Sequence, residues 1–269
     1  EIHRNISMVM AIKKYIDYTD DFDYMLNMGI KIVVAIARFW AQRVSFSNKH
    51  KKFVILGVTG PNEYENNVNN NWYTNYGASW CLRYALRNLE IIKEFNNEKF
   101  NSFNFEKGEL DFWKKVTENM YYPFSEEHNL YMQDDGFEDK ELIHVDEIPK
   151  RERPLNQNWS WDKILRSPYI KQGDVVQGIY YFEDEFSEEF IKNHFEFYEK
   201  YTVHESSLSA SIHSVVASHV NQIDKSYKYF LRSSRLDLDD YNKEIEQGLH
   251  ITSMAGSWIA LVEGFGGLK

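Results

Sequence analysis

One carboxylic acid, Glu63, stands in a stretch whose other side chains are suited to holding a sugar. It follows the turn at Gly60-Pro61 and lies among the asparagines and aromatic residues of positions 62–75. Amides hydrogen-bond hydroxyl groups, and aromatic rings cover the apolar face of a pyranose. A carboxyl group among apolar rings can keep its proton near neutral pH, as a general acid for glycosidic cleavage must. The stretch therefore indicates a proton donor in a sugar site. The alternative is an asparagine-rich surface loop, because Asn favours turns for local reasons.

Lys171 and Gln172 stand in a second polar segment, at the expected start of a helix. The preceding residues, Asn156 to Asp162, again combine amides with tryptophans. An ammonium group and an amide can both hydrogen-bond the hydroxyl groups of a sugar. We interpret Lys171 and Gln172 as a substrate-binding pair. The alternative is a solvated lysine beside a helix cap formed by Asp174.

Two further segments, Thr202–Ser209 and Leu249–Trp258, place histidines and hydroxyl residues ahead of apolar runs. A histidine beside a carboxylate, such as His204 with Glu205, suits anion binding or proton transfer. Small hydroxyl residues that open a helix suit an anion as well, because the free backbone amides face the ligand. Ordinary helix capping is the alternative interpretation of both segments.

The sequence lacks the motifs that are typical of metal-dependent, nucleotide-binding and serine-nucleophile enzymes. The sequence has no His-Glu-x-x-His metal motif, no Gly-x-x-x-x-Gly-Lys phosphate loop and no Gly-x-Ser-x-Gly elbow, so we expect no metal.

The net charge of −10 argues against nucleic acid or an anionic membrane as partner. The single Cys81 lies in an apolar run, which predicts a buried structural thiol in a reducing compartment. We see no apolar run that approaches a bilayer-spanning length and no signal peptide, so we expect a cytoplasmic protein with no membrane contact.

The elements that position these segments are predicted to be helices within one large domain, since 269 residues with 43% hydrophobic content can bury a sizeable core. An apolar run, Phe53–Val58, predicts a short strand, and Tyr121–Pro168 is irregular. Similar helices joined by long loops favour antiparallel pairs in a toroid, because no repeat of fixed period indicates a solenoid. Helical spacing of apolar residues predicts helices over Ile6–Tyr18, Phe22–Arg43, Trp72–Phe95, Leu110–Met120, Gln172–Phe182, Glu188–Tyr201, Leu208–Val220, Ile223–Leu236 and Thr252–Phe265.

The stretch that begins Gly57-Val-Thr-Gly-Pro-Asn-Glu63 and runs to Asn75 resembles glycoside hydrolase family 65. Further similar motifs follow in the family's order along the whole chain. They are Glu1-Ile-His-Arg-Asn5, Ile36-Ala-Arg-Phe-Trp40, Trp159-Ser-Trp-Asp-Lys-Ile-Leu-Arg-Ser-Pro168, Lys171-Gln172 with Asp174-Val175, Thr202-Val-His-Glu-Ser-Ser207, Arg235-Leu-Asp-Leu-Asp-Asp240 and His250-Ile-Thr-Ser-Met-Ala-Gly256. Two positions depart from the family pattern: Ile6 stands where relatives usually have Gly, and Gly173 where they usually have Ala.

The resemblance implies an all-α fold, an (α/α)6 catalytic barrel of which residues 1–269 form the larger C-terminal part. The family's upstream β-sandwich and downstream β domain would lie outside this chain. The implied activity is that of an inverting disaccharide phosphorylase, which converts maltose and phosphate into β-D-glucose 1-phosphate and D-glucose without a metal or organic cofactor. The implied assembly is a homodimer. In this resemblance Glu63 matches the proton donor and Lys171 with Gln172 the substrate-binding pair, while the residues on the phosphate side are His204, Ser206, His250, Thr252 and Ser253.

Two alternatives stay open. An α-glucoside hydrolase of the maltose or trehalose type would need a second carboxylate, roughly 6.5 to 9.5 Å from the acid, to act as base on water. Glu205 is the carboxylate in the polar loops that we nominate for that role. In the other alternative the chain is a truncated relic without activity, and we expect these 269 residues in isolation to be inactive.

Overall fold

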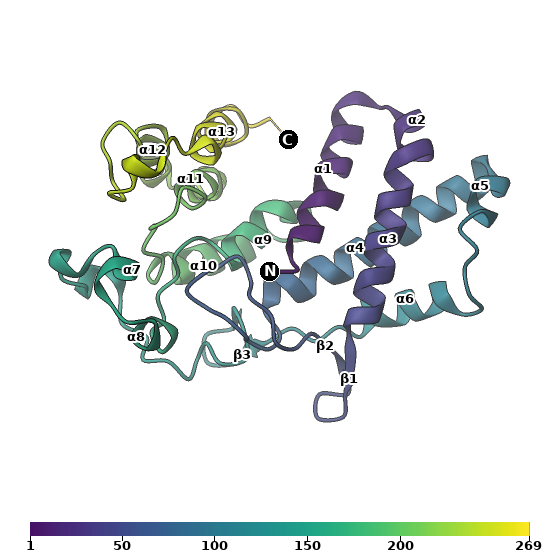
Figure 1. The fold of residues 1–269 in the computed structure, drawn as a ribbon, viewed down its shortest axis with the longest axis horizontal. Helices are drawn as coiled ribbons and strands as arrows, with labels where there is room; N and C mark the ends of the chain where they lie inside the picture. Colours follow the sequence, from purple (N-terminus) through teal and green to yellow (C-terminus); the bar gives the residue numbers. More distant parts are fainter. Residues whose placement is uncertain (269) are drawn as a thin grey trace. The chain divides into compact units, whose positions relative to one another are not determined.

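The computed structural model describes residues 1–268, apart from the side chain of Gln247, and it is mostly helical (Figure 1). The chain divides into two compact units. The first unit consists of Glu1–Thr59 and Asn67–Pro123. The second consists of Gly60–Asn66 and the chain from Phe124 onward. The loop that carries Glu63 thus belongs to the second unit, although the first unit surrounds it in sequence.

The helices of the first unit begin and end close to their predicted limits. The segment predicted as Phe22–Arg43 is one continuous helix that contains a π-helical turn at Met25–Gly29. The predicted strand ends at Val54, because the backbone of Ile55 instead exchanges hydrogen bonds with Asn70. The elements are α1 (Arg4–Thr19), α2 (Phe22–Tyr24), α3 (Ile30–Arg43), the antiparallel pair β1 (Ser45–Ser47) and β2 (Lys52–Val54), α4 (Trp72–Phe95), α5 (Asn97–Asn101) and α6 (Glu109–Glu118).

The core of the first unit forms where α1 and α3 pack on α4. Gly77 on α4 permits this approach, since a Cβ atom there would lie 2.3 Å from Cδ1 of Ile6. Ile6 is fully buried. The departure from the family pattern at position 6 is therefore accommodated by a glycine on the facing helix. Cys81 is also fully buried, and burial raises the pKa of its thiol, which confirms the predicted structural role.

The helix formed by Phe22–Arg43 is long and apolar enough to cross a membrane, with a mean hydropathy of 1.3 over 18 residues. The prediction that no run approaches that length was therefore wrong. Core helices pass the same test, and this one buries Val33, Ala37 and Trp40 completely. On another side Arg38 Nε donates to Glu109 Oε1 over 2.8 Å, which ties α3 to α6. Packing inside the first unit accounts for the buried apolar residues of this helix, whereas Phe22 and Met28 are exposed.

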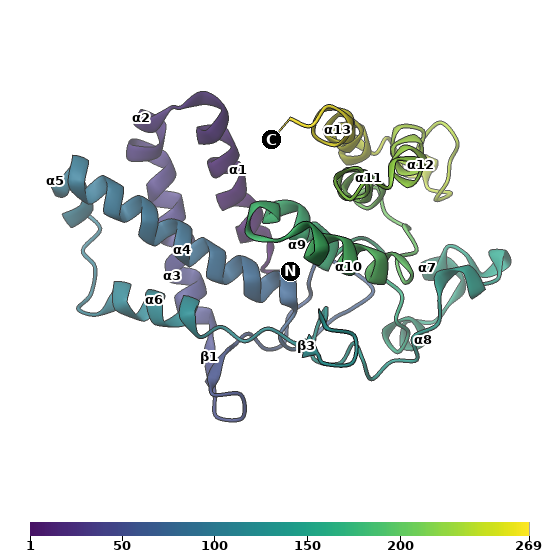
Figure 2. The same ribbon diagram turned by 180° about the vertical axis from the view of Figure 1, so that it is seen from behind.

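The second unit begins with irregular chain and continues as consecutively packed helices. Figure 2 shows α9 beside α10, and α11 contacts α9, α10, α12 and α13. This packing confirms the predicted helical class, while the closed ring of an (α/α)6 barrel stays a prediction. The elements are the pair β3 (Phe124–Ser125) and β4 (Leu130–Tyr131), α7 (Leu155–Asn158), α8 (Trp161–Leu165), α9 (Val175–Tyr181), α10 (Glu188–Glu199), α11 (Ala210–His219), α12 (Ile223–Ser234) and α13 (Ile251–Ile259), which a π-helical segment prolongs to Phe265.

His194 on α10 makes the stability of this unit depend on pH. Its Nε2 accepts a hydrogen bond from the backbone N–H of Tyr131 at 3.0 Å, and its Nδ1 donates to the carbonyl of Phe190 at 2.8 Å, so the ring must be neutral. Burial lowers the pKa of His194 to about 4 from its ordinary value of 6.5. Between these values the unfolded chain binds a proton that the folded chain does not. The contribution of His194 to the free energy of unfolding is therefore full above pH 6.5 and is lost as the pH falls toward 4.

Candidate active site

The loop that carries Glu63 is anchored on both sides of that residue. On one side Asn62 is buried, and its Oδ1 accepts hydrogen bonds from the backbone N–H groups of Tyr64 and Lys171, at 3.1 and 3.0 Å. The backbone N–H of Asn62 donates to Asp174 Oδ2 at 3.1 Å. Asp174 precedes α9 but makes no side-chain cap there, so its carboxylate serves this loop instead. The helix consequently begins at Val175 and leaves Gln172 in the loop.

On the other side of Glu63, Tyr64 and Glu65 are buried. The Tyr64 ring joins a hydrophobic cluster with Leu155 and Val203 among other residues, and its hydroxyl donates to Glu205 Oε2 at 2.7 Å. Burial, with the charge of Glu205, raises the pKa of Tyr64, so this hydroxyl keeps its proton. Glu65 forms an ion pair with Lys140. The neighbours thus hold the backbone while Glu63 itself stays exposed.

Glu63 and Lys171, one member of the predicted substrate-binding pair, come together in the structure. Lys171 Nζ lies 2.6 Å from Glu63 Oε2, and the Glu63 side chain is 41% exposed. The side chain of Gln172 is buried, yet its Oε1 has no hydrogen-bond partner among the described residues. A buried carbonyl oxygen without a donor is costly, and a sugar hydroxyl would supply the donor. An acid and a cation therefore meet here, and Gln172, the next residue in the chain, holds a buried acceptor without a donor among the described residues.

Glu205 is a buried anchor of the same site. Its Oε2 accepts from Tyr64 and from the backbone N–H of Leu155 at 2.8 Å, and its Oε1 lies 3.4 Å from Arg153 Nε. Its own backbone N–H donates to the carbonyl of Lys171 at 3.0 Å. A base on water needs an accessible lone pair, whereas this carboxylate is only 4% exposed. The nomination of Glu205 as a hydrolytic base finds no support in these contacts.

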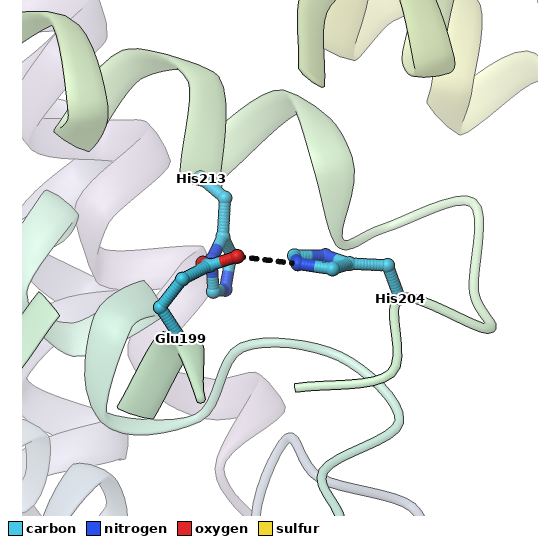
Figure 3. Close-up of side chains that lie close together, drawn as sticks. All are labelled: Glu199, His204 and His213. Carbon is cyan, nitrogen blue, oxygen red and sulfur yellow. Dashed lines mark hydrogen bonds and ion pairs between the residues drawn. The ribbon is translucent and has the colours of Figure 1, made fainter. Parts of the chain in front are cut away.

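His204 forms a buried cluster with two residues that sequence reasoning missed, Glu199 and His213. Figure 3 shows the Glu199 carboxylate facing both imidazoles: His213 Nδ1 lies 2.7 Å from Oε2, and His204 Nε2 lies 3.3 Å from Oε1. The other ring nitrogen of His204 is 2.7 Å from Ser209 Oγ. Burial lowers the pKa of His204 to about 4. Burial alone would raise the pKa of Glu199, but its contacts with His204 and His213 lower it, so an ionised carboxylate faces both rings.

The same cluster is where the described residues could hold a metal ion, since one ligand atom from each lies within 4.8 Å of the others. Its electrostatics oppose a cation. The carboxylate is already hydrogen-bonded to both rings, and Glu199 and His204 line a cavity of about 620 Å³ with a basic wall. Cationic side chains outnumber the carboxylates of Asp146, Glu196 and Glu199 in that wall: they are Arg153, Lys200, Lys225, Lys228 and Arg232. We therefore interpret the cluster as a hydrogen-bonded support.

The segment before α13 is held by an aspartate that sequence reasoning also missed. Asp237 accepts from the backbone N–H of His250 at 2.9 Å and pairs with its Nδ1 at 2.5 Å. These hydrogen bonds from His250 lower the pKa of Asp237. The hydroxyls of Ser207 and Thr252 lie 3.0 Å apart, so the two predicted anion segments meet. No side chain caps α13, which removes the capping explanation for Thr252.

The remaining predicted phosphate residues have protein partners. Ser253 Oγ donates to the carbonyl of Ser233 at 2.7 Å, which links α13 to α12. Ser206 Oγ accepts from the backbone N–H of Leu208 at 3.2 Å. His204 is engaged by Ser209 and Glu199, as described above. A phosphate contact from any of these three stays a prediction.

Comparisons with known proteins identify relatives that match the chain over its whole length. The chain is 54% identical over all 269 residues to the maltose phosphorylase of Bacillus subtilis strain 168, and 40% identical over 274 aligned residues to an α,α-trehalose phosphorylase of Thermoanaerobacter brockii. In both cases the match covers 100% of this chain and 35% of the relative, so the chain spans about a third of their length. A solved structure from the human microbiome, ascribed to a kojibiose phosphorylase, superimposes with a TM-score of 0.90 at 35% identity, covering 98% of this chain and 39% of that one.

The chain also matches a protein family over almost its whole length. Residues 1–259 match the glycosyl hydrolase family 65 central catalytic domain. That range contains the loop of Glu63, the Lys171-Gln172 pair and the segment before α13. The chain belongs to glycosyl hydrolase family 65, as part of its central catalytic domain.

Proposed function

We propose that the polypeptide carrying this chain is an inverting disaccharide phosphorylase whose substrate is maltose. The observation that carries the proposal is the exposed Glu63 carboxyl beside Lys171 Nζ. It is supported by Gln172, the next residue in the chain, whose buried Oε1 has no hydrogen-bond partner among the described residues. The relatives named above are phosphorylases, and the one with 54% identity acts on maltose by name. The proposal thus joins side chains suited to a sugar to relatives that are sugar phosphorylases.

In the proposed reaction Glu63 gives its proton to the glycosidic oxygen as the bond from that oxygen to C1 breaks. Phosphate attacks C1 from the opposite face, so a new C1–O bond forms with inversion, and Glu63 regains a proton from solvent. Lys171 donates hydrogen bonds to sugar hydroxyls, and Gln172 Oε1 accepts from one. Because substrate hydroxyls compete for the ammonium group, sugar binding would loosen its ion pair with Glu63 and favour the protonated acid.

The phosphate side is proposed from the segment before α13. His250, oriented by Asp237, and Thr252, beside Ser207, lie at the start of α13, where the positive end of the helix dipole suits an oxyanion. Phosphate is itself the nucleophile, so no base on water is needed, in agreement with the buried position of Glu205. The homodimer and the cytoplasmic location stay predictions.

The test is the dependence of maltose cleavage on phosphate, measured on the polypeptide at its full encoded length. We expect glucose and sugar phosphate in equal amounts when phosphate is present, and almost no glucose without it. Proton NMR of the first product should show the β anomer. Trehalose and kojibiose, offered in parallel, test the choice of disaccharide. Rapid glucose release without phosphate would instead favour the hydrolase.

A further inference from the structure

Glu205 contacts Tyr64, the neighbour of Glu63, and also Lys171 itself, and this arrangement suggests a role of its own. Its carboxylate holds Tyr64, which follows Glu63 in the chain, while its backbone N–H holds the carbonyl of Lys171. We propose that Glu205 is a positioning residue that sets the place of the acid Glu63 relative to Lys171. The kinetic part of this inference rests on the proposed function.

The contacts form a short and rigid connection. Tyr64 and Leu155, which donate to Glu205 Oε2 at 2.7 and 2.8 Å, are at most 1% exposed. The chain around Lys171 runs parallel to the chain around Glu205 and is hydrogen-bonded to it. The N–H of Val203 donates to the carbonyl of Ile170 at 2.8 Å, next to the bond from Glu205 N–H to the carbonyl of Lys171. A shift of Glu205 would therefore move both halves of the site.

The two glutamates differ in a way that separates their roles. Glu63 is 41% exposed and faces a cation, as a group that exchanges a proton with substrate must. Glu205 is buried, and both of its carboxylate oxygens already face donors on the protein. A group in that position acts on the reaction through the residues it holds.

Substitutions of Glu205 and of its partner Tyr64 should reduce the rate of phosphorolysis to graded extents. Glu205→Gln keeps an oxygen for Tyr64 and Leu155 and disturbs only the contact with Arg153, so phosphorolysis should stay within about tenfold of the wild type. Glu205→Ala removes every side-chain contact, and misplacing the acid by about 1 Å should cost on the order of a hundredfold in kcat. Tyr64→Phe removes one donor and should cost about tenfold. KM should change less than kcat in all three variants.

The leaving group distinguishes positioning of the acid from a general loss of structure. The experiment compares maltose with α-glucosyl fluoride, whose fluoride leaves without a proton, using phosphate and the polypeptide at full encoded length. Glu205→Ala should slow maltose cleavage at least about tenfold more than fluoride release, since only the first needs Glu63. The matched control is Glu183→Ala, which removes a carboxylate bonded to His219 outside the site and should leave the ratio unchanged. Equal losses on both substrates, or a Gln variant as damaged as the Ala variant, would overturn the proposal.

Hydrogen exchange tests the anchoring without any enzymatic reaction. Backbone amides of residues 60–66 should exchange about tenfold faster in Glu205→Ala and Tyr64→Phe than in the wild type, while Glu183→Ala should leave them unchanged. Unchanged exchange in Tyr64→Phe and in Glu205→Ala would refute the anchoring role. A wild type that cleaves no disaccharide with phosphate would refute the proposed function alone, because this measurement needs no substrate.

Discussion

The substitution Glu63→Gln separates catalysis from folding. The glutamine keeps the shape of the side chain and an oxygen for Lys171, but it has no proton to give. Loss of a general acid costs roughly two to four orders of magnitude in rate, which is about 3 to 5 kcal/mol of activation free energy. The ion pair that is also lost involves a side chain 41% exposed, and such a pair contributes at most about 1 kcal/mol to stability. The catalytic effect should therefore exceed any effect on folding.

The assay is the initial rate of sugar phosphate formation from maltose and phosphate, with the polypeptide at full encoded length. The matched control is Glu127→Gln, an exposed glutamate in the turn between β3 and β4. We expect that control to keep normal activity, and Glu63→Gln to keep a normal unfolding curve. With α-glucosyl fluoride, Glu63→Gln should recover most of its rate, because fluoride leaves unprotonated.

Two results would refute the assignment of Glu63 as the acid. One is a rate for Glu63→Gln within tenfold of the wild type on maltose. The other is an equal loss on maltose and on α-glucosyl fluoride, which would show that the residue binds substrate and donates no proton.

Three further predictions concern stability and completeness. Urea unfolding should show that the wild type loses about 3 kcal/mol more of its free energy of unfolding than His194→Gln does between pH 7 and pH 4. The reason is that the unfolded chain takes up a proton on His194 that the folded chain does not bind. Identical pH dependence in both proteins would contradict this. Gly256→Ala should lower the free energy of unfolding by about 1 to 3 kcal/mol, since its Cβ would lie 2.4 Å from Ser211 Oγ between α13 and α11. Gly136→Ala, whose Cβ would have no neighbour closer than 3.5 Å, is the control, and equal effects of the two would refute the packing argument. Assayed alone, these 269 residues should show no phosphorolysis. An inverting displacement needs every group held in line, and the chain spans 35% of the B. subtilis relative. Turnover equal to that of the longer polypeptide would disprove this.

Much of the helical organisation could be predicted from the sequence, because helix periodicity is a local property of the chain. The segment Trp72–Phe95 is a helix with the predicted ends, and α10 and α12 begin at their predicted residues. The helix predicted to begin at Gln172 begins instead at Val175, since nothing local shows that Asp174 gives its carboxylate to a loop more than a hundred residues away. Helix starts depend on such partners, which periodicity does not contain.

By itself the sequence determined the kinds of chemical group in the site and the family that holds them. Glu63, Lys171 and Gln172 could be nominated from residue type and neighbours alone. Only the tertiary structure decided which groups meet. It placed Lys171 against Glu63, left Gln172 Oε1 without a donor among the described residues, and buried Glu205 among donors. The physical reason is that the role of a carboxylate follows from its exposure and its partners, and both come from residues distant in the chain.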